Sequence, residues 1–199
     1  MSITLYRSEG WVMLFDVSRD RLVSMVGAEA VFVATPGMLA DIPDGVPGYE
    51  IMRTVGIPTG IFRPQVPLNS GCFPSVAEKI DLADYVAPTG AEAWKVFGWI
   101  PLTHLALDTS NGKVFGFSEN GGSVQCLHAD LSSLVKLTSE LGALLKSFVP
   151  TEDDDEDYER RAAAVEHIRM EVAERDELPF HGDSIWPEVM EEIAAGMWS

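Results

Sequence analysis

Leu105-Ala-Leu-Asp-Thr-Ser-Asn-Gly-Lys-Val-Phe-Gly-Phe117 is the stretch that best defines the fold of this 199-residue chain. Asn111 and Gly112 can both adopt the positive φ that a type I′ turn requires, and the residues on either side are β-formers. The stretch therefore predicts a β-hairpin. Asp108 stands just before the turn, where its carboxylate is expected to accept hydrogen bonds from turn backbone amides rather than to act in catalysis.

The segments around this hairpin predict further strands. Between residues 51 and 125 the chain is rich in glycine, proline and short apolar segments, which is typical of a sheet. Residues 123–128 predict one more strand, and the apolar runs 11–15 and 30–34 predict strands near the N-terminus. Residues 41–48 hold two prolines, two glycines and two aspartates, which indicates a surface loop.

The last third of the chain predicts helices. Apolar residues recur at three- and four-residue spacing from 131 to 148, with Asp130 placed as N-cap and Pro150 beyond the end. A second amphipathic helix follows an acidic run, and its apolar face is expected to hold Tyr158, Ala162, Val165, Ile168 and Val172. A third, short helix is predicted to begin at Trp186-Pro187. Its inward residues are expected to be Val189, Ile193 and Met197.

Charge is the strongest signal in the composition. The chain carries 14 basic and 31 acidic residues, a net charge of −17. Residues 1–150 contribute −5 (10 basic, 15 acidic) and residues 151–199 contribute −12 (4 basic, 16 acidic). Such a surface repels nucleic acids and anionic membranes, which both bind through Lys and Arg, and it attracts basic proteins. An acidic composition that serves solubility alone is the other interpretation.

The cytoplasm is the expected location of the protein. No apolar run reaches the ~18 residues that a membrane span requires, and charged residues from Asp16 onward interrupt the apolar start before a signal-peptide core could form. Cys72 and Cys126 lie 54 residues apart without a CxxC pair, so no disulfide framework is expected. Neither membrane association nor a cofactor is expected.

Few sequence features indicate an enzyme. GxGxxG, GxxxxGK[ST], HExxH and EF-hand motifs are missing from the sequence. Ser118 lies in the nearest approach to a nucleophile elbow, but the second glycine comes one residue late and the segment follows a hairpin. A zinc site is an alternative that would use His104, Cys126 and His128, since the last two would share one face of a strand. A small buried cysteine is the simpler interpretation, and a non-enzymatic binding protein is favoured.

The tryptophans allow two interpretations. Trp94 and Trp186 stand beside other apolar residues and are expected in the core. Trp99, if exposed, could anchor a protein partner, because tryptophan is enriched at interface hot spots.

Several of these segments, in this order, resemble the SUKH superfamily, specifically its immunity-protein branch from bacterial toxin systems. Val55-Gly56-Ile57-Pro58 is similar to the family's Gly-Leu-Pro step, and Phe97-Gly98 leads into its apolar strand. The segment 108–115 resembles the family's Asp-x-x-x-Gly-x-Val-Tyr hairpin, with Phe115 in the aromatic place.

Two further segments extend the resemblance to the C-terminus. Asp130-Leu-Ser-Ser-Leu134 is similar to the family's Asn-x-Ser-Leu helix start, with aspartate in place of asparagine, and Trp186 with its helix resembles the closing tryptophan segment. The resemblance spans roughly residues 50–199. The structural positions that transfer are Gly56, Pro58, Asp108, Gly112 and Trp186.

The resemblance implies an α+β fold in which a curved mixed sheet packs against helices. It implies a single SUKH-like domain over residues 1–199, with 1–50 as a less defined N-terminal portion and 151–199 as an acidic helical extension. It also implies an immunity protein of a polymorphic toxin system, which binds and neutralises a cognate toxin without catalysis. The partner would be a basic nuclease or deaminase domain, and direct nucleic acid binding is not expected.

The acidic run is the candidate contact surface for that toxin. It consists of Glu152, Asp153, Asp154, Asp155, Glu156 and Asp157. A solvated, flexible connector is the other interpretation of the run. For the whole protein, the alternative function is that of a regulatory or scaffold protein on the same fold that binds a housekeeping partner.

Overall fold

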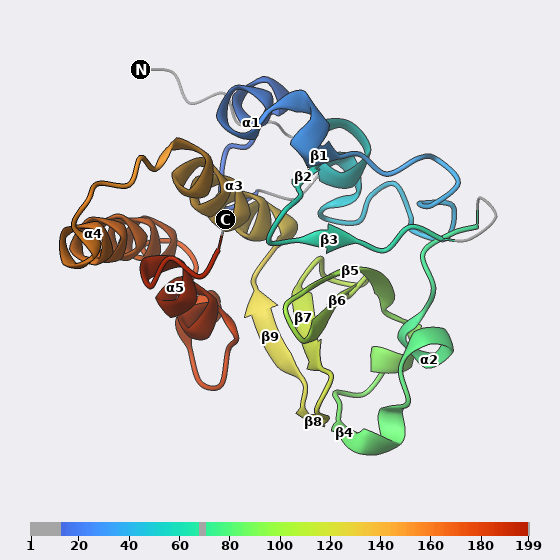
Figure 1. Cartoon of the computed structure of the whole chain (residues 1–199). Helices are drawn as coiled ribbons and strands as arrows, with labels where there is room; N and C mark the ends of the chain where they lie inside the picture. Colours follow the sequence, from blue (N-terminus) through green and yellow to red (C-terminus); the bar gives the residue numbers. More distant parts are fainter. Residues whose placement is uncertain (1–12, 68–70, 199) are drawn as a thin grey trace.

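A five-stranded antiparallel sheet lies at the centre of the computed structural model, which describes residues 13–67 and 71–198 (Figure 1). Its strand order is β3-β5-β6-β7-β9. The strands are β3 (Arg63–Pro64), β5 (Lys95–Ile100), β6 (Thr103–Leu107), β7 (Val114–Ser118) and β9 (Gln125–His128). Every neighbouring pair in this sheet is antiparallel.

Two short strand pairs flank this sheet. β1 (Val31–Phe32) pairs with β2 (Ile57–Pro58) in antiparallel orientation. β4 (Tyr85–Val86) pairs with β8 (Gly122–Ser123) in parallel, and in the described parts of the chain parallel pairing is limited to these two strands. The α+β class expected from the sequence is confirmed.

The predicted hairpin forms, as strands β6 and β7, but its turn is not of type I′. Within the described residues Leu102 is the only non-glycine with positive φ, so Asn111 does not adopt the expected conformation, whereas Gly112 does, at 78°. The side chain of Asp108 accepts hydrogen bonds from the Ser110 amide (2.9 Å) and from the Asn111 side chain (2.8 Å). These bonds organise a wider loop, which the Asp108 amide closes by donating to the Lys113 carbonyl (2.9 Å).

Helices make up most of the remaining structure. They are α1 (Arg19–Val26), α2 (Val76–Lys79), α3 (Leu131–Ser147), α4 (Asp154–Ala173) and α5 (Trp186–Ala194). Shorter helical turns are η1 (Ala28–Ala30), η2 (Ile51–Val55), η4 (Leu82–Asp84), η5 (Ala91–Ala93) and η6 (Leu178–Phe180). Asp130 caps α3 as predicted, because its Oδ1 accepts the Ser133 amide at 3.0 Å.

The apolar run at residues 11–15 was expected to be a strand. Residues 11 and 12 lie outside the described residues, and residues 13–15 do not form a strand. Instead the Leu14 amide donates to Asp130 Oδ2 (2.9 Å) and the Phe15 amide to Ser132 Oγ (3.0 Å). Side chains at the start of α3 thus accept the hydrogen bonds that the amides of Leu14 and Phe15 would donate to a neighbouring strand in a sheet.

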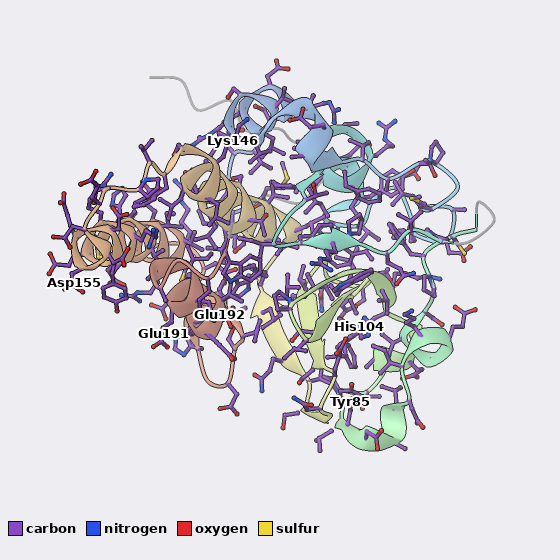
Figure 2. All side chains as sticks on the ribbon, viewed as in Figure 1. Tyr85, His104, Lys146, Asp155, Glu191 and Glu192 are labelled. Atoms are coloured by element: carbon purple, nitrogen blue, oxygen red, sulfur yellow. The ribbon has the colours of Figure 1, made fainter. Side chains whose placement is uncertain are left out.

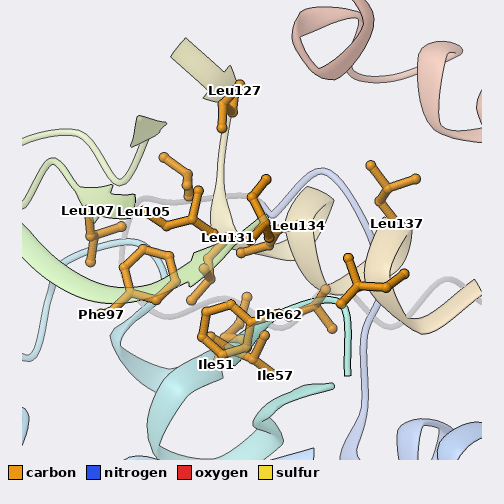
Figure 3. Packing of buried hydrophobic residues seen from close by; sticks show 14 of the residues in the cluster. Ile51, Ile57, Phe62, Phe97, Leu105, Leu107, Leu127, Leu131, Leu134 and Leu137 are labelled. Carbon is orange, nitrogen blue, oxygen red and sulfur yellow. The ribbon is translucent and has the colours of Figure 1, made fainter. Parts of the chain in front are cut away.

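The main core lies between one face of the sheet, α3 and the N-terminal part of the chain. Figure 3 shows Leu105 and Leu107 of β6 facing Leu131 and Leu134 of α3. N-terminal side chains from Phe15 to Val46 belong to the same cluster. The described part of the N-terminal portion, residues 13–50, therefore contributes to this core.

The other face of the sheet carries a smaller core built around Trp94. Its ring stacks on Phe115 at 4.1 Å between centroids, and Val96, Ala106 and Phe117 lie in the same cluster. Trp94 and Trp186 are both buried, as the sequence predicted. Trp99, on β5, is only partly buried.

Two residues expected on inward helix faces are exposed. Tyr158 is 50% exposed, because the segment beside the first turns of α4 is the loop that follows α3 and not α3 itself. Met197 is 71% exposed, because α5 ends at Ala194 and Gly196 turns the chain with a φ of 73°. Of the residues predicted between them, Ala162 is only partly buried, whereas Val165, Ile168, Val172, Val189 and Ile193 are buried as expected.

Candidate partner-binding surface

The acidic run forms the start of helix α4. Asp153 is the N-cap, and its Oδ1 accepts the amides of Asp155 (3.0 Å) and Glu156 (3.1 Å). The carboxylates that follow lie in the first turn, where the free N–H groups of the helix favour negative charge. The run is therefore mostly part of a helix and not the flexible connector that the sequence also allowed.

Asp157 differs from the other five acidic residues of the run. It is 2% exposed, and its carboxylate accepts hydrogen bonds from the amide and hydroxyl of Thr151 (2.9 and 3.1 Å) and from Arg160 (3.0 Å). Arg161 lies 3.8 Å from its other oxygen. Asp157 thus ties α4 to the preceding loop, and its carboxylate is not available to a partner. The other five residues of the run are exposed.

Ion pairs neutralise only part of the negative charge on the C-terminal helices. Glu166 pairs with Arg169 on α4, and Glu171 pairs with Lys136 of α3. Within the described chain, the exposed acids of residues 151–199 that have no salt bridge are Glu152, Asp153, Asp154, Asp155, Glu156, Glu159, Glu174, Asp183, Glu188 and Glu191. Figure 2 shows Asp155 at the outer end of α4, with Glu191 and Glu192 on the neighbouring α5. This end of the molecule therefore carries a concentrated negative potential.

Trp186 joins α5 to the sheet through a buried polar network. Its indole N–H donates to His128 Nε2 at 2.9 Å, so the ring proton of His128 resides on Nδ1, 3.0 Å from Ser133 Oγ. Burial lowers the pKa of His128 to about 3 and keeps the ring neutral. Asp176 Oδ2 lies 4.0 Å from Nδ1, but it forms no ion pair with a neutral ring and instead accepts the Ala129 amide at 2.9 Å.

The residues considered for a zinc site do not converge. A β-bulge pairs Val114 with His128 but Phe115 with Cys126, so Cys126 and His128 point to opposite faces of the sheet and the expected shared face is wrong. Both ring nitrogens of His128 are already hydrogen-bonded. Burial also raises the pKa of the Cys126 thiol, which disfavours a thiolate ligand. In residues 13–67 and 71–198, no three His, Cys, Asp or Glu side chains are grouped so that they could hold a metal.

The glycines and the proline singled out in the sequence have structural roles. Gly56 has a φ of 92°, and a Cβ there would lie 2.5 Å from Val31 Cγ1 and 2.7 Å from the Phe32 carbonyl. A Cβ on Gly112 would likewise lie 2.3 Å from Pro47 Cβ. Pro58 lies in β2, opposite Val31. These positions allow the N-terminal segment to lie against β2 and against the hairpin loop.

A groove of about 280 Å³ lies between the sheet and the start of α5, and the sequence did not predict it. Its lining includes Leu102, Ser118, Asn120, Gln125, Asp183 and Glu188. These residues come from separate segments that only the pairing of β6, β7 and β9 and the docking of α5 bring together. The sequence held one local signal for this groove: Pro101, which favours a turn, is followed directly by the bulky apolar residue Leu102.

The fold and surface together define an α+β protein whose C-terminal helical segment, residues 151–199, is strongly acidic. The model of the SUKH-4 immunity protein family matches residues 17–192, and the chain belongs to this family. No significant match was found among curated proteins or among solved structures. Of the helices in the described residues, none combines the length and the apolar character needed to cross a bilayer.

Proposed function

We propose that this protein binds a basic toxin domain in the cytoplasm of the producing cell and blocks it by direct contact. The observation that carries the proposal is the concentration of exposed, unpaired carboxylates on the C-terminal helices of a SUKH-4 family chain. The partner class is a nuclease or nucleic-acid deaminase, because such enzymes present Lys and Arg to phosphates.

Charge complementarity supplies the mechanism of inhibition. Carboxylates that occupy the toxin's phosphate-binding surface exclude the nucleic acid by sterics and by repulsion. They also accelerate the encounter, because long-range attraction raises association rates at low salt. The proposed contacts in the acidic run are the five exposed residues, from Glu152 to Glu156. Neither a cofactor nor a catalytic step takes part in this mechanism.

Co-expression with the C-terminal domain of any large protein encoded beside this gene, as the candidate toxin domain, tests the proposal. Cell survival together with a co-purified complex is the expected result, and the affinity should fall as salt rises. A harmless neighbouring domain, or one that kills regardless, would favour the regulatory or scaffold function.

A matched pair of triple variants tests the acidic run. The first variant removes three charges from the run, with Glu152→Gln, Asp154→Asn and Glu156→Gln. It leaves Asp153 as the N-cap and Asp157 as the hydrogen-bonded link between α4 and the preceding loop. Glu29→Gln, Asp44→Asn and Glu92→Gln remove three exposed charges elsewhere. The run variant should slow association by several-fold at low salt and the control much less. Equal effects would exclude the run as the contact surface.

A further inference from the structure

The groove beside α5 has the chemistry of an acceptor site for a positive group. Asp183 and Glu188 are exposed on one side of it, and Ser118, Asn120 and Gln125 offer hydroxyl and amide oxygens on the other. None of the described residues that line the groove is Lys or Arg. Neither carboxylate has a salt bridge to any cation of the described chain.

Leu102 forms an apolar, strained part of the rim. It occupies the second position of the two-residue turn between β5 and β6, after Pro101. It has a φ of 54° in a place where turns of this kind favour glycine or asparagine, and its side chain is 59% exposed. A leucine there is unfavourable both for the backbone and for solvation. Neither feature helps the isolated protein to fold, so a contact outside the chain is the simplest reason for both.

The size of the groove indicates what could occupy it. Pockets for small-molecule ligands usually measure about 300–1,000 Å³, and this groove, at about 280 Å³, is at the lower limit. It has room for one long side chain. Lys and Arg combine a cationic head with an aliphatic stem, and such a side chain matches two carboxylates beside an exposed leucine.

We propose that the groove receives a lysine or arginine side chain of the toxin domain, whose charge pairs with Asp183 and Glu188 while its stem packs on Leu102. This inference rests on the proposed function and deepens it. The acidic run on α4 attracts the partner from a distance, and the groove retains it after docking.

Binding kinetics separate these two roles. A catalytically inactive form of the toxin domain identified by the co-expression test would be immobilised, and the full chain passed over it. The groove variant is Asp183→Asn with Glu188→Gln. The control, Asp154→Asn with Glu156→Gln, changes the net charge equally on the acidic run. A third variant, Leu102→Gly, removes the apolar contact at a φ that glycine accepts without strain.

The groove variant should dissociate at least about tenfold faster with little change in association rate, because loss of a desolvated charge pair acts mainly on dissociation. Leu102→Gly should also dissociate faster while its melting temperature is not lowered. The control should mainly associate more slowly, and its dissociation rate should rise less than that of the groove variant.

Each contrary outcome can be assigned to one proposal. Wild-type binding together with groove and Leu102 variants that dissociate at the wild-type rate would overturn the groove and leave the immunity function standing. A wild-type chain that does not bind the toxin domain would overturn both. Melting curves of all variants identify any loss of binding that comes from unfolding.

Discussion

The indole N–H of Trp186 donates to Nε2 of His128 at 2.9 Å, although 58 residues separate the two in the chain. Both side chains are fully buried. A single hydrogen bond thus joins the last helix to the edge strand β9 and determines the tautomer of the histidine.

Replacing Trp186 by phenylalanine should destabilise the fold. The change leaves His128 Nε2 buried without a partner and removes part of a packed ring, so the free energy of unfolding should fall by about 2–4 kcal/mol. Trp198→Phe is the control, because that half-buried indole bonds only to Glu192 (3.0 Å) and its loss should cost less than about 1 kcal/mol. Denaturant titrations of both variants measure the difference. Equal losses would show that the network contributes little.

Stability should fall at acid pH because of His128. Its pKa is about 3 in the folded protein and about 6.5 in the unfolded chain. Below pH 6.5 the unfolded state therefore binds a proton that the folded state does not. The contribution of neutral His128 to the free energy of unfolding is constant above pH 6.5 and is lost as the pH falls toward 3. Roughly 2 kcal/mol of it is lost between pH 7.5 and 5.

Comparison with a His128→Gln variant isolates this effect, because protonation of the many carboxylates contributes to both proteins. The free energy of unfolding should depend less on pH in the variant. Parallel pH profiles would mean that the pKa of His128 in the folded protein is close to its value in the unfolded chain, which an NMR titration of its ring would also reveal.

The same change should have a large effect on stability at Asp157 and a small one at Asp155, although these residues stand two positions apart. Asp157→Asn places an amide among the Thr151 and Arg160 donors and should lower the free energy of unfolding by about 2–4 kcal/mol. Asp155→Asn changes an exposed first-turn residue and should stay within about 0.5–1 kcal/mol. Thermal and denaturant melts check both. A large effect at Asp155 would contradict the assignment of Asp157 as the structural member of the run.

Alanine substitutions at two glycines distinguish the cost of backbone strain from the cost of a steric clash. Gly60→Ala should be destabilised by strain alone, about 1–2 kcal/mol, because its φ is 110° but nothing lies within 4 Å of the added Cβ. Gly56→Ala adds the clash with Val31 and Phe32 and should lose clearly more, or fail to fold. Comparable losses in denaturant titrations would show that β1 yields to the methyl group without cost.

Local patterns predicted much of this fold. Helices α3, α4 and α5 follow from apolar spacing, joined by Asp130 as the cap of α3 and Pro187 in the first turn of α5, since these signals act within one or two turns. The β6–β7 hairpin follows from Asn111-Gly112 between β-formers, although its turn type does not. In this loop the Asp108 side chain accepts hydrogen bonds from turn amides and widens the loop. The residue types in the loop allow both this arrangement and a type I′ turn, so the sequence does not distinguish the two.

Long-range contacts account for the errors. The apolar run before α1 looks like a strand, but its amides bond to Asp130 and Ser132 at the start of α3. Cys126 and His128 were expected on one face, and a bulge in the pairing of β9 with β7 separates them. A hydrogen-bond acceptor more than a hundred residues away, or one extra residue in a pair of β-strands, cannot be read from the local sequence.

Composition, periodicity and short motifs are local properties, and the α+β class, the acidic character of residues 151–199 and the family resemblance follow from them without a structure. Which carboxylates are exposed became clear from the packing of the chain, which separates buried Asp157 from its five neighbours. It also brought Leu102, Asp183 and Glu188 to one groove. Burial and proximity depend on how distant segments pack, and packing is a property of the whole chain rather than of any window within it.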